Sequence, residues 1–256
     1  MNLNLRQGMS GDLNQIAIIW CDEDLLVIDK PAGMLALPDG YDPSLPHVKS
    51  VLSPRYGPLW IVHRLDRETS GLMVLARNAA SHKDLNTQFQ ERRVKKIYTA
   101  IIIGNPVWKQ KRLDKPLTLN VGRRHRTRID LENGKHSETL ITVRERLKYY
   151  CLVDAEPETG RRHQIRAHLA GEGYPIVCDS LYGKQKALLR SDISSRYQAG
   201  SSTNDTLLAR TALHSSSITL DHPGSQQRCK FESKISSDLE LTLEFLRDSI
   251  PDLRGK

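Results

Sequence analysis

Residues 63–71 have the sequence HRLDRETSG, a charged segment that leads directly into the apolar run LMVLA at residues 72–76. The glycine and the small polar residues predict a loop, and the apolar run predicts a buried strand. Asp66 stands in this loop between Arg64 and Arg67, whose positive charge favours the ionised carboxylate. We therefore interpret Asp66 as a nucleophile or base rather than a proton donor. The charge pattern alone is equally typical of a surface ion pair in a turn.

A second segment, TGRRHQIRAHL at residues 159–169, also places a cluster of cations directly after a glycine. Ile165 and Leu169 stand four residues apart and predict a helix from about residue 162 to residue 170, with an apolar stripe facing the core. Arg162 and Arg166 have the same spacing, so they share a neighbouring face of that helix. The segment therefore predicts cations beside the buried face of a short helix.

Together the two segments resemble the signature blocks of the RluA-type pseudouridine synthases. In that family an HRLD-x-x-TSG loop carries the catalytic aspartate, and a GR-x-HQIR-x-H block carries a partner arginine. Further blocks follow in the family's order: DLLVIDKPAG at residues 24–33, KIY at 96–98, PIVCDSLYG at 175–183, LH at 213–214 and HP at 222–223. The resemblance covers roughly residues 16–240. Cys178 departs from it, because a glycine is usual there, and a turn that requires positive φ would strain a larger residue.

The resemblance implies an α+β fold: a mixed, largely antiparallel, bent β-sheet with flanking helices and a central active-site cleft. We expect a polar tail at residues 1–15 and a single catalytic domain at 16–250. Family members often carry an extra N-terminal RNA-binding domain of the S4-like kind. Here the first block begins almost at once, so we expect a stand-alone catalytic domain. The Ser-rich segment 184–210 predicts a long flexible surface loop.

Periodicity supports the same fold class. Runs of apolar and β-branched residues predict strands at residues 16–20, 25–28, 72–76, 97–103, 139–143, 151–155 and 218–220. Ser81 is expected to cap a helix in which Leu85 and Phe89 stand four residues apart. A further helix is expected from about residue 238 to residue 246.

The positive charge is concentrated in one part of the chain. The 256 residues carry a net charge of +8, and residues 91–128 hold twelve lysines and arginines against two acids. Such concentration is typical of a polyanion-binding surface, although a solvated basic face with no partner is the simpler alternative. Arg123, Arg124 and Arg126 precede an Asn-Gly pair at residues 133–134, which favours a hairpin turn. We expect these arginines to project on a β-ribbon toward structured RNA.

Other features exclude several protein classes. No apolar run approaches the ~18 residues of a membrane helix, and the N-terminus lacks the apolar centre of a signal peptide. The four cysteines are widely spaced, and the histidines lack metal-ligand spacing. We therefore expect a cytoplasmic monomer with reduced thiols and no metal or membrane partner.

The resemblance implies isomerisation of uridine to pseudouridine, which changes no oxidation state and needs no cofactor. Asp66 would either add to C1′ of the ribose or remove its 2′ proton. By resemblance, Arg166 would pair with Asp66, and Tyr98 would stack on the uracil and accept its C5 proton. The uridine must first leave its stack, and Arg64 or His63 would fill the vacated space. The expected substrate-binding residues are His63, Arg64, Arg67, Arg162, His163, Arg123, Arg124 and Arg126.

Two other functions stay open at this point. A nucleoside or glycoside hydrolase needs two carboxylates, and Glu68 or Asp179 is available as the second. A non-catalytic RNA-binding protein would use the basic region without Asp66. For the synthase, large-subunit ribosomal RNA and tRNA are both candidate substrates.

Overall fold

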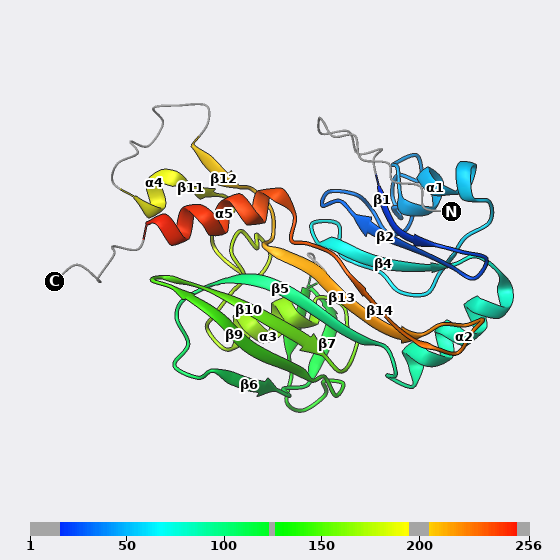
Figure 1. The fold of residues 1–256 in the computed structure, drawn as a ribbon. Coiled ribbons are helices and arrows are strands. Elements are labelled where there is room, and N and C mark those ends of the chain that lie inside the picture. The colour runs from blue at the N-terminus through cyan, green and yellow to red at the C-terminus, as the bar shows by residue number, and fades with distance from the viewer. Residues whose placement is uncertain (1–15, 123–125, 195–204, 250–256) are drawn as a thin grey trace.

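A ten-stranded sheet forms the framework of the protein (Figure 1). The computed structural model describes residues 16–122, 126–194 and 205–249. The sheet order is β1 (Ala17–Cys21), β2 (Leu25–Lys30), β4 (Ser70–Ala76), β13 (Leu213–Asp221), β5 (Lys95–Ile103), β10 (Tyr150–Pro157), β9 (Thr139–Leu147) and β6 (Gln110–Leu113). In addition, β14 (Arg228–Glu232) pairs with β13, and β3 (Trp60–Ile61) pairs with β4. Within these ranges all pairings are antiparallel except that of β4 with β13, so the expected mixed sheet is confirmed.

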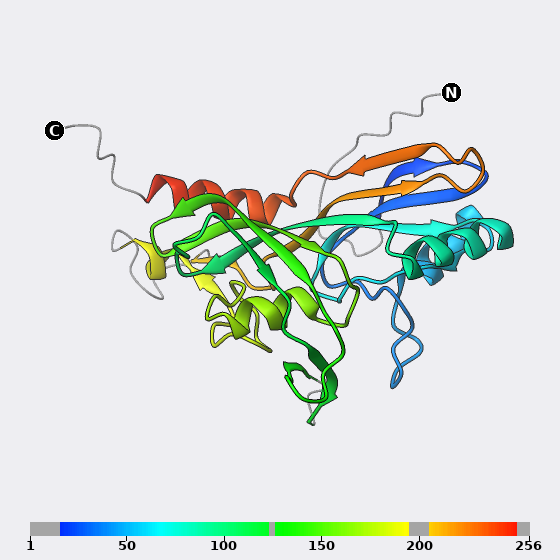
Figure 2. The ribbon, with the colours of Figure 1, turned by 90° about the horizontal axis from the view of Figure 1, so that it is seen from below.

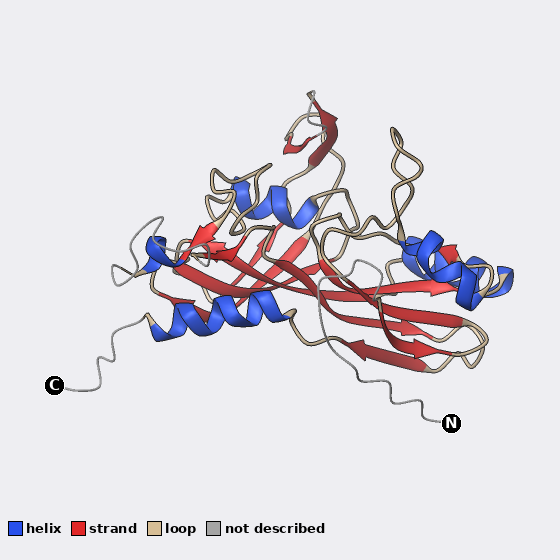
Figure 3. Ribbon diagram, turned by 90° about the horizontal axis from the view of Figure 1, so that it is seen from above, coloured by secondary structure: helices blue, strands red, loops and turns tan. Residues whose placement is uncertain are grey.

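Helices cover both faces of the sheet (Figures 2 and 3). Helices α3 (Gln164–Gly171) and α5 (Ser237–Asp248) lie on opposite faces of the sheet. Helices α1 (Val48–Tyr56) and α2 (Ala79–Gln90) pack at the end formed by β2 and β4, against alternate residues of these strands. Two small pairs complete the structure: β7 (Leu117–Val121) with β8 (Arg126–Ile129), and β11 (Leu188–Leu189) with β12 (Thr206–Leu208), beside the short α4 (Arg190–Ile193). None of the helices in the described ranges has the length and apolarity to cross a bilayer.

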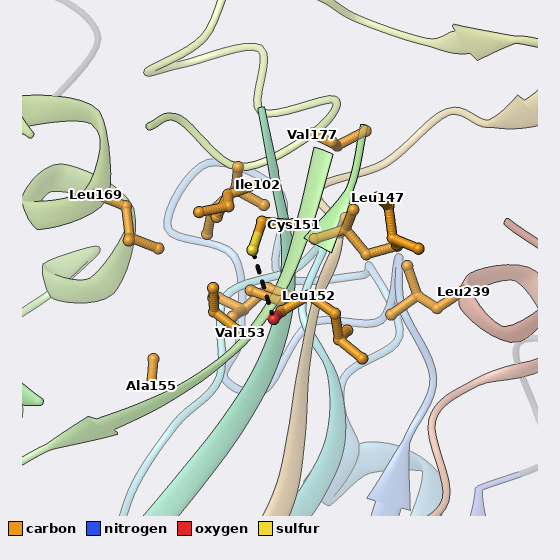
Figure 4. Close-up of a cluster of buried hydrophobic side chains, with 14 of the residues drawn as sticks. Ile102, Leu147, Cys151, Leu152, Val153, Ala155, Leu169, Val177 and Leu239 are labelled. Atoms are coloured by element: carbon orange, nitrogen blue, oxygen red, sulfur yellow. Dashed lines mark hydrogen bonds between the residues drawn. The ribbon is translucent and has the colours of Figure 1, made fainter. Parts of the chain in front are cut away.

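The core is divided along the sheet. One cluster joins β5, β9 and β10 to α3 and α5, and Figure 4 shows Cys151, Val153 and Leu169 within it. Two further clusters lie around β2 and β4, with α1 and α2 packed against them. Every residue of β4 is buried, as its unbroken apolar run predicted, because the strand lies in the sheet interior with covered faces.

One glycine fixes the centre of the sheet. Gly71 has a φ of 108°, and a Cβ atom there would lie 2.4 Å from the backbone oxygen of Ser215. Only glycine permits this approach, which sets β4 against β13 in parallel, with Ser70 opposite His214. The loop that carries Asp66 thereby ends at the middle of the sheet.

All seven predicted strands are present, but the predicted cap of one helix was wrong. Helix α2 begins at Ala79, and its cap is Asn78, whose side chain accepts the backbone N–H of Ser81 at 2.8 Å. The Ser81 hydroxyl donates instead to Asp24 at 2.6 Å. The segment 184–210 is not a continuous loop, since it contains β11, α4 and β12; residues 195–204 lie outside the described ranges.

The predicted basic ribbon exists as β7 and β8, with its turn in a different place. The strands are joined after Gly122, which has a φ of 69°. The Asn-Gly pair forms a later turn, in which the N–H of Gly134 donates to the carbonyl of Asp130 at 3.0 Å. Cys178 does adopt a positive φ, 57°, so the turn that usually carries glycine keeps its conformation here with a buried thiol.

Candidate active site

A cavity of about 660 Å³ lies between the two charged segments. Its lining comes from residues 62–66, from the end of α2 and the start of β5, and from the segment 157–166 that leads into α3. The side chains of Asp66, Tyr98 and Arg166 all belong to this lining. Three segments far apart in the sequence therefore bring the predicted catalytic residues to one cavity at the middle of the sheet.

Asp66 is linked to the protein interior through Arg166. Arg166 Nη1 donates to Asp66 Oδ2 at 2.9 Å, while Nε and Nη2 donate to the two oxygens of Asp179 at 2.7 and 2.8 Å. Asp179 is fully buried, and the backbone N–H groups of Leu181 and Tyr182 also donate to it. Burial opposes the charge of Arg166, but its bonds to Asp179 and Asp66 raise its pKa overall. Asp179 therefore fixes the guanidinium on its buried side, and the remaining nitrogen, Nη1, is directed at Asp66. The Asp66 side chain remains 20% exposed.

Gln164 fixes the loop before α3. Its Oε1 accepts the Thr159 hydroxyl at 2.6 Å and the backbone N–H of Arg161 at 3.1 Å. Its Nε2 donates to the carbonyl of Glu138 at 2.8 Å and to the hydroxyl of Thr139 at 2.9 Å. A buried amide with all of these partners holds the loop in one conformation. Arg166 lies in the first turn of α3, two residues after Gln164, and is positioned by this attachment.

His163 is a neutral neighbour of Asp66. Its Nε2 lies 3.6 Å from Asp66 Oδ1. The hydroxyl of Tyr182 accepts the N–H of Thr127 at 2.7 Å and lies 3.1 Å from His163 Nδ1, to which it can donate its own proton. When Tyr182 donates in this contact, the ring proton lies on Nε2, the nitrogen facing Asp66. Burial lowers the pKa of His163 to about 4, although the charge of Asp66 opposes the shift.

Tyr98 forms an apolar part of the cavity wall. It lies on β5 between Ala155 of β10 and Ser215 of β13, and Ile165 and Leu213 line the cavity with it. Burial, together with the charge of Asp66, raises the pKa of Tyr98 above its ordinary value. The phenol is therefore neutral at pH 7 and offers the cavity an aromatic ring.

The predicted substrate-binding arginines occupy different settings. Arg64 and Arg162 are exposed and line the cavity. Arg67 is also exposed but lies outside the cavity lining, and its Nε donates to the carbonyl of Gly33 at 3.0 Å. Arg67 thus connects the Asp66 loop to the turn after β2.

The ribbon is attached to the same site. Arg126 is exposed on β8, whereas the adjacent Thr127 is buried, and its hydroxyl donates to the carbonyl of Arg162 at 2.8 Å. The ribbon arginine therefore lies one residue from a direct contact with the cavity loop. Arg123 and Arg124, which were predicted to bind RNA, lie outside the described residues.

His63 belongs to the wall rather than to the open part of the cavity. Its Nε2 accepts the backbone N–H of Val74 at 2.9 Å, and its ring stacks on Phe89 with centroids 4.9 Å apart. Burial lowers the pKa of His63 to about 3, so the ring is neutral. With its ring held on both sides, His63 is not available to replace an extruded base, and only Arg64 keeps that predicted role.

Sequence reasoning missed the buried Lys30. Its Nζ donates to the carbonyls of Pro31, Met34 and Arg67 at 2.8, 2.9 and 3.3 Å, and the side chain has no exposed surface. Burial lowers the pKa of Lys30 to about 7. Strand alternation gives a signal for it, because Lys30 continues the inward-facing series of Ile28 in an apolar strand. Lys30 thus ties the Asp66 loop to the turn after β2.

One group outside the cavity has metal-binding residue types. Asp22, Asp24 and His222 place one donor atom each within 4.8 Å of one another. These groups already have protein partners: His222 Nε2 contacts Asp22 at 2.8 Å, and Asp24 accepts from Asn78 and Ser81 at the start of α2. We interpret the group as a tie between strand turns and the α2 cap.

Comparisons with known proteins agree with the geometry. The family model described as RNA pseudouridylate synthase matches residues 24–171. Ribosomal large subunit pseudouridine synthase D of Pseudomonas aeruginosa is 35% identical over 247 residues, which cover 91% of this chain and 72% of that protein. Ribosomal large subunit pseudouridine synthase C of Vibrio vulnificus is 34% identical over 249 residues, which cover 94% and 74%.

A solved structure shares the fold. Human RNA Pseudouridylate Synthase Domain Containing 4 superposes with a TM-score of 0.73 and 24% sequence identity, covering 90% of this chain and 93% of that one. The fold, the matched family model and the relatives agree with the resemblance carried by the two charged segments. The chain therefore belongs to the RluA-type pseudouridine synthases, isomerases that convert uridine in RNA to pseudouridine.

Proposed function

We propose that this isomerase acts on uridines of large-subunit ribosomal RNA and that Asp66, Arg166 and Tyr98 form its catalytic centre. The relatives named for the large ribosomal subunit support the substrate class. The observation that carries the catalytic assignment is the chain of ion pairs from buried Asp179 through Arg166 to the partly exposed Asp66. The Asp66 carboxylate at the end of this chain is partly exposed to the cavity, where a ribose can approach it.

The reaction divides into steps that an aspartate can promote. The N1–C1′ bond breaks while the Asp66 carboxylate either adds to C1′ or takes the 2′ proton of the ribose. The freed base turns, and C5 forms a new bond to C1′. In the first route the bond between Asp66 and C1′ breaks in this step, and in the second Asp66 returns the proton to C2′. C5 then loses its proton and N1 gains one, so the product is an isomer of the substrate.

Arg166 and Tyr98 have supporting parts in this proposal. Arg166 orients the Asp66 carboxylate, because its other donors are fixed by Asp179. Tyr98 offers its ring to the uracil, as aromatic side chains do for unstacked bases. Burial keeps the phenol protonated, so we assign Tyr98 to stacking and leave the C5 proton to another acceptor.

Arg64 is proposed to occupy the space that the extruded uridine leaves. It is exposed at the cavity rim, two residues before Asp66. Extrusion costs a few kcal/mol in structured RNA and less in single strands. Arg64→Ala should therefore lower activity on folded RNA more than activity on an unstructured fragment with the same uridine. Full activity of Arg64→Ala on folded RNA would contradict this role.

Neither of the two carboxylates considered for the hydrolase alternative, Asp179 and Glu68, is placed to act as its second group. Asp179 is fully buried with both oxygens bonded to Arg166, and Glu68 is not among the residues lining the cavity. A hydrolytic pair needs both groups beside the scissile bond. The geometry therefore disfavours both of these second carboxylates; Glu158 also lines the cavity, so the hydrolase alternative is tested by the free uracil measured below.

The proposal is tested by tritium release from uridine-C5-labelled transcripts of large-subunit ribosomal RNA and of tRNA. Asp66→Asn should reduce release by roughly a thousandfold or more, whereas Glu68→Gln, the same change two residues later, should leave it near the wild-type rate. Free uracil is quantified in parallel. Release from tRNA alone would overturn the substrate class, and release that survives Asp66→Asn, or free uracil as product, would overturn the catalytic assignment.

A further inference from the structure

The active-site cavity extends past the proposed catalytic groups along strand β5. Lys96 and Tyr98 stand two residues apart on this strand, so their side chains lie on the same face, about 7 Å apart along it. Both line the cavity. Lys95, the residue before Lys96, points to the opposite face of the strand. It pairs with Glu156 at 2.9 Å, and neither residue belongs to the cavity lining. One of two adjacent lysines is thus directed toward the reaction site.

Lys96 has no carboxylate at ion-pair distance within the described ranges. Its Nζ lies 6.0 Å from the ring centroid of Phe89 and faces Gly160, where an added Cβ atom would be 3.9 Å away. Burial lowers the pKa of Lys96, and Glu158 is the charge that opposes this shift. A half-buried ammonium without an anion is costly in the free protein, so a bound anion would stabilise it.

Arg161 presents a second unfilled donor at the same wall. It follows Gly160 directly and lines the cavity. Its Nε is buried and has no hydrogen-bond partner among the described residues, although its backbone N–H is held by Gln164 at 3.1 Å. Buried polar atoms are rarely left without a partner. Because this Nε has no accessible surface, the Arg161 side chain would turn within the cavity wall to bring the donor to an anion of the substrate.

We propose that Lys96 and Arg161 form a phosphate subsite that binds a phosphodiester group adjoining the target uridine. The inference rests on the proposed function, because it takes the ring of Tyr98 as the place of the uracil. A nucleotide with its base over Tyr98 carries its phosphates beyond the ribose. Lys96 lies one strand repeat from Tyr98, and Arg161 directly follows the glycine that Lys96 faces. A guanidinium and an ammonium together suit a phosphate diester, the first as a planar donor and the second as a point charge.

The first test measures the salt dependence of binding to unmodified large-subunit ribosomal RNA. For each phosphate contact, the slope of log K against log salt changes by about 0.7 for single strands and about 0.9 for duplexes. Lys96→Met keeps the aliphatic stem and should lower the slope by about this amount, and Lys96→Arg should restore it. The matched control is Lys95→Met, the same change on the opposite face, which should leave the slope unaltered. Thermal unfolding checks that each variant is folded, and Arg161→Gln provides an independent variant of the same subsite.

An unchanged slope in both Lys96→Met and Arg161→Gln would overturn the subsite. A lowered slope in a protein whose wild type releases no tritium would keep the subsite and overturn the proposed function. The two failures are therefore distinguishable.

The second test locates the phosphate. Short RNAs that carry the mapped uridine receive one neutral methylphosphonate linkage, on its 5′ side in one set and on its 3′ side in the other. At the contacted linkage the modification should weaken binding to wild type by about tenfold or more, and Lys96→Met should bind both RNAs alike. Additive effects of Lys96→Met and the neutral linkage on both sides would contradict a direct contact.

Discussion

At the scale of single residues, Tyr98 shows how burial selects one of two roles that an aromatic residue can have. A tyrosine could serve as a base only as a phenolate, and burial disfavours that form. Its ring remains available for stacking, so we expect Tyr98→Phe to keep the rate of tritium release within about tenfold of wild type. Tyr98→Ala should lose more, since base stacking on an aromatic ring is worth about 1–3 kcal/mol. Rapid-quench measurement of tritium release compares the variants.

One result would contradict the assignment of Tyr98 to stacking alone. A Tyr98→Phe enzyme that binds RNA normally but releases tritium a thousandfold more slowly, about the effect of losing an essential proton-transfer group, would return the C5 proton to Tyr98.

Asp179 is a second residue whose effect can be separated from contact with the substrate. Asp179→Asn removes the charge behind Arg166 while keeping an oxygen for the two backbone N–H donors. Leaving one member of a buried ion pair without its partner typically costs about 3–5 kcal/mol, so the free energy of unfolding should fall by about this amount. The value of kcat should also fall about ten- to a hundredfold, because Arg166 would no longer be held against Asp66. Urea unfolding and steady-state kinetics measure the two effects, and an unchanged kcat would show that Arg166 needs no support from behind.

At the scale of elements, Lys30 joins β2 to the loop that enters β4. Lys30→Met removes the donor from three carbonyls, including that of Arg67 in the Asp66 loop. It also removes a buried charge, which offsets part of the stability loss. We expect a modest change in thermal unfolding but a fall in kcat of about ten- to a hundredfold with little change in KM, because the loop loses its register. Wild-type kcat in a folded Lys30→Met protein would contradict this positioning role.

Element boundaries show what local sequence patterns can and cannot predict. Apolar and β-branched runs found seven strands, six of which are buried on at least one face. The seventh, β1, is a largely exposed edge strand, and its composition alone identified it. The same patterns missed β6, β7 and β14, which are short or partly exposed. Asn78 and Ser81 are both suitable caps for α2, and only the contact of Ser81 with Asp24, 57 residues earlier in the chain, removes Ser81 from that role. Contacts of this range have no local signature.

The residues of the candidate active site also fall into those that the sequence could predict and those that depend on long-range contacts. Asp66, Tyr98 and Arg166 were predicted because sequence blocks resembling a known family carry them, and the structure brings all three to one cavity. The bond between Asp179 and Arg166 escaped prediction, since only packing of α3 against the following turn sets their distance. Lys96 also escaped prediction, because a lysine on a strand is ordinarily solvated. Only the structure shows that it lines the cavity and that no carboxylate of the described residues lies at ion-pair distance.

At the scale of the whole molecule, the site depends on bringing distant segments to the centre of one sheet. The parallel contact of β4 with β13 closes the sheet at Gly71, and α3 packs below the same point. The β7–β8 ribbon projects from the face that carries α3 (Figures 2 and 3), and Thr127 connects it to the cavity loop. RNA bound along the ribbon would therefore contact the part of the protein that is fixed to Arg162. The basic residues and the reaction centre are in this way parts of one surface.

This arrangement buries several histidines in their neutral form, which predicts acid sensitivity of the whole fold. Burial is the main cause that lowers the pKa values of His63, His163, His168 and His214, to about 3 for His63 and about 4 for His163. The unfolded chain takes up these protons near pH 6.5, whereas the folded chain does not. The unfolded state therefore binds more protons between pH 6.5 and about 4, and stability is lost as the pH falls through this range, by up to about 1.4 kcal/mol per pH unit for each histidine. Urea unfolding across the range should give a smaller slope for His63→Gln by up to this amount and an unchanged slope for His136→Gln, whose side chain is 58% exposed. Equal slopes for wild type and His63→Gln would mean that His63 is protonated in the folded state, and its role in the cavity wall would have to be revised.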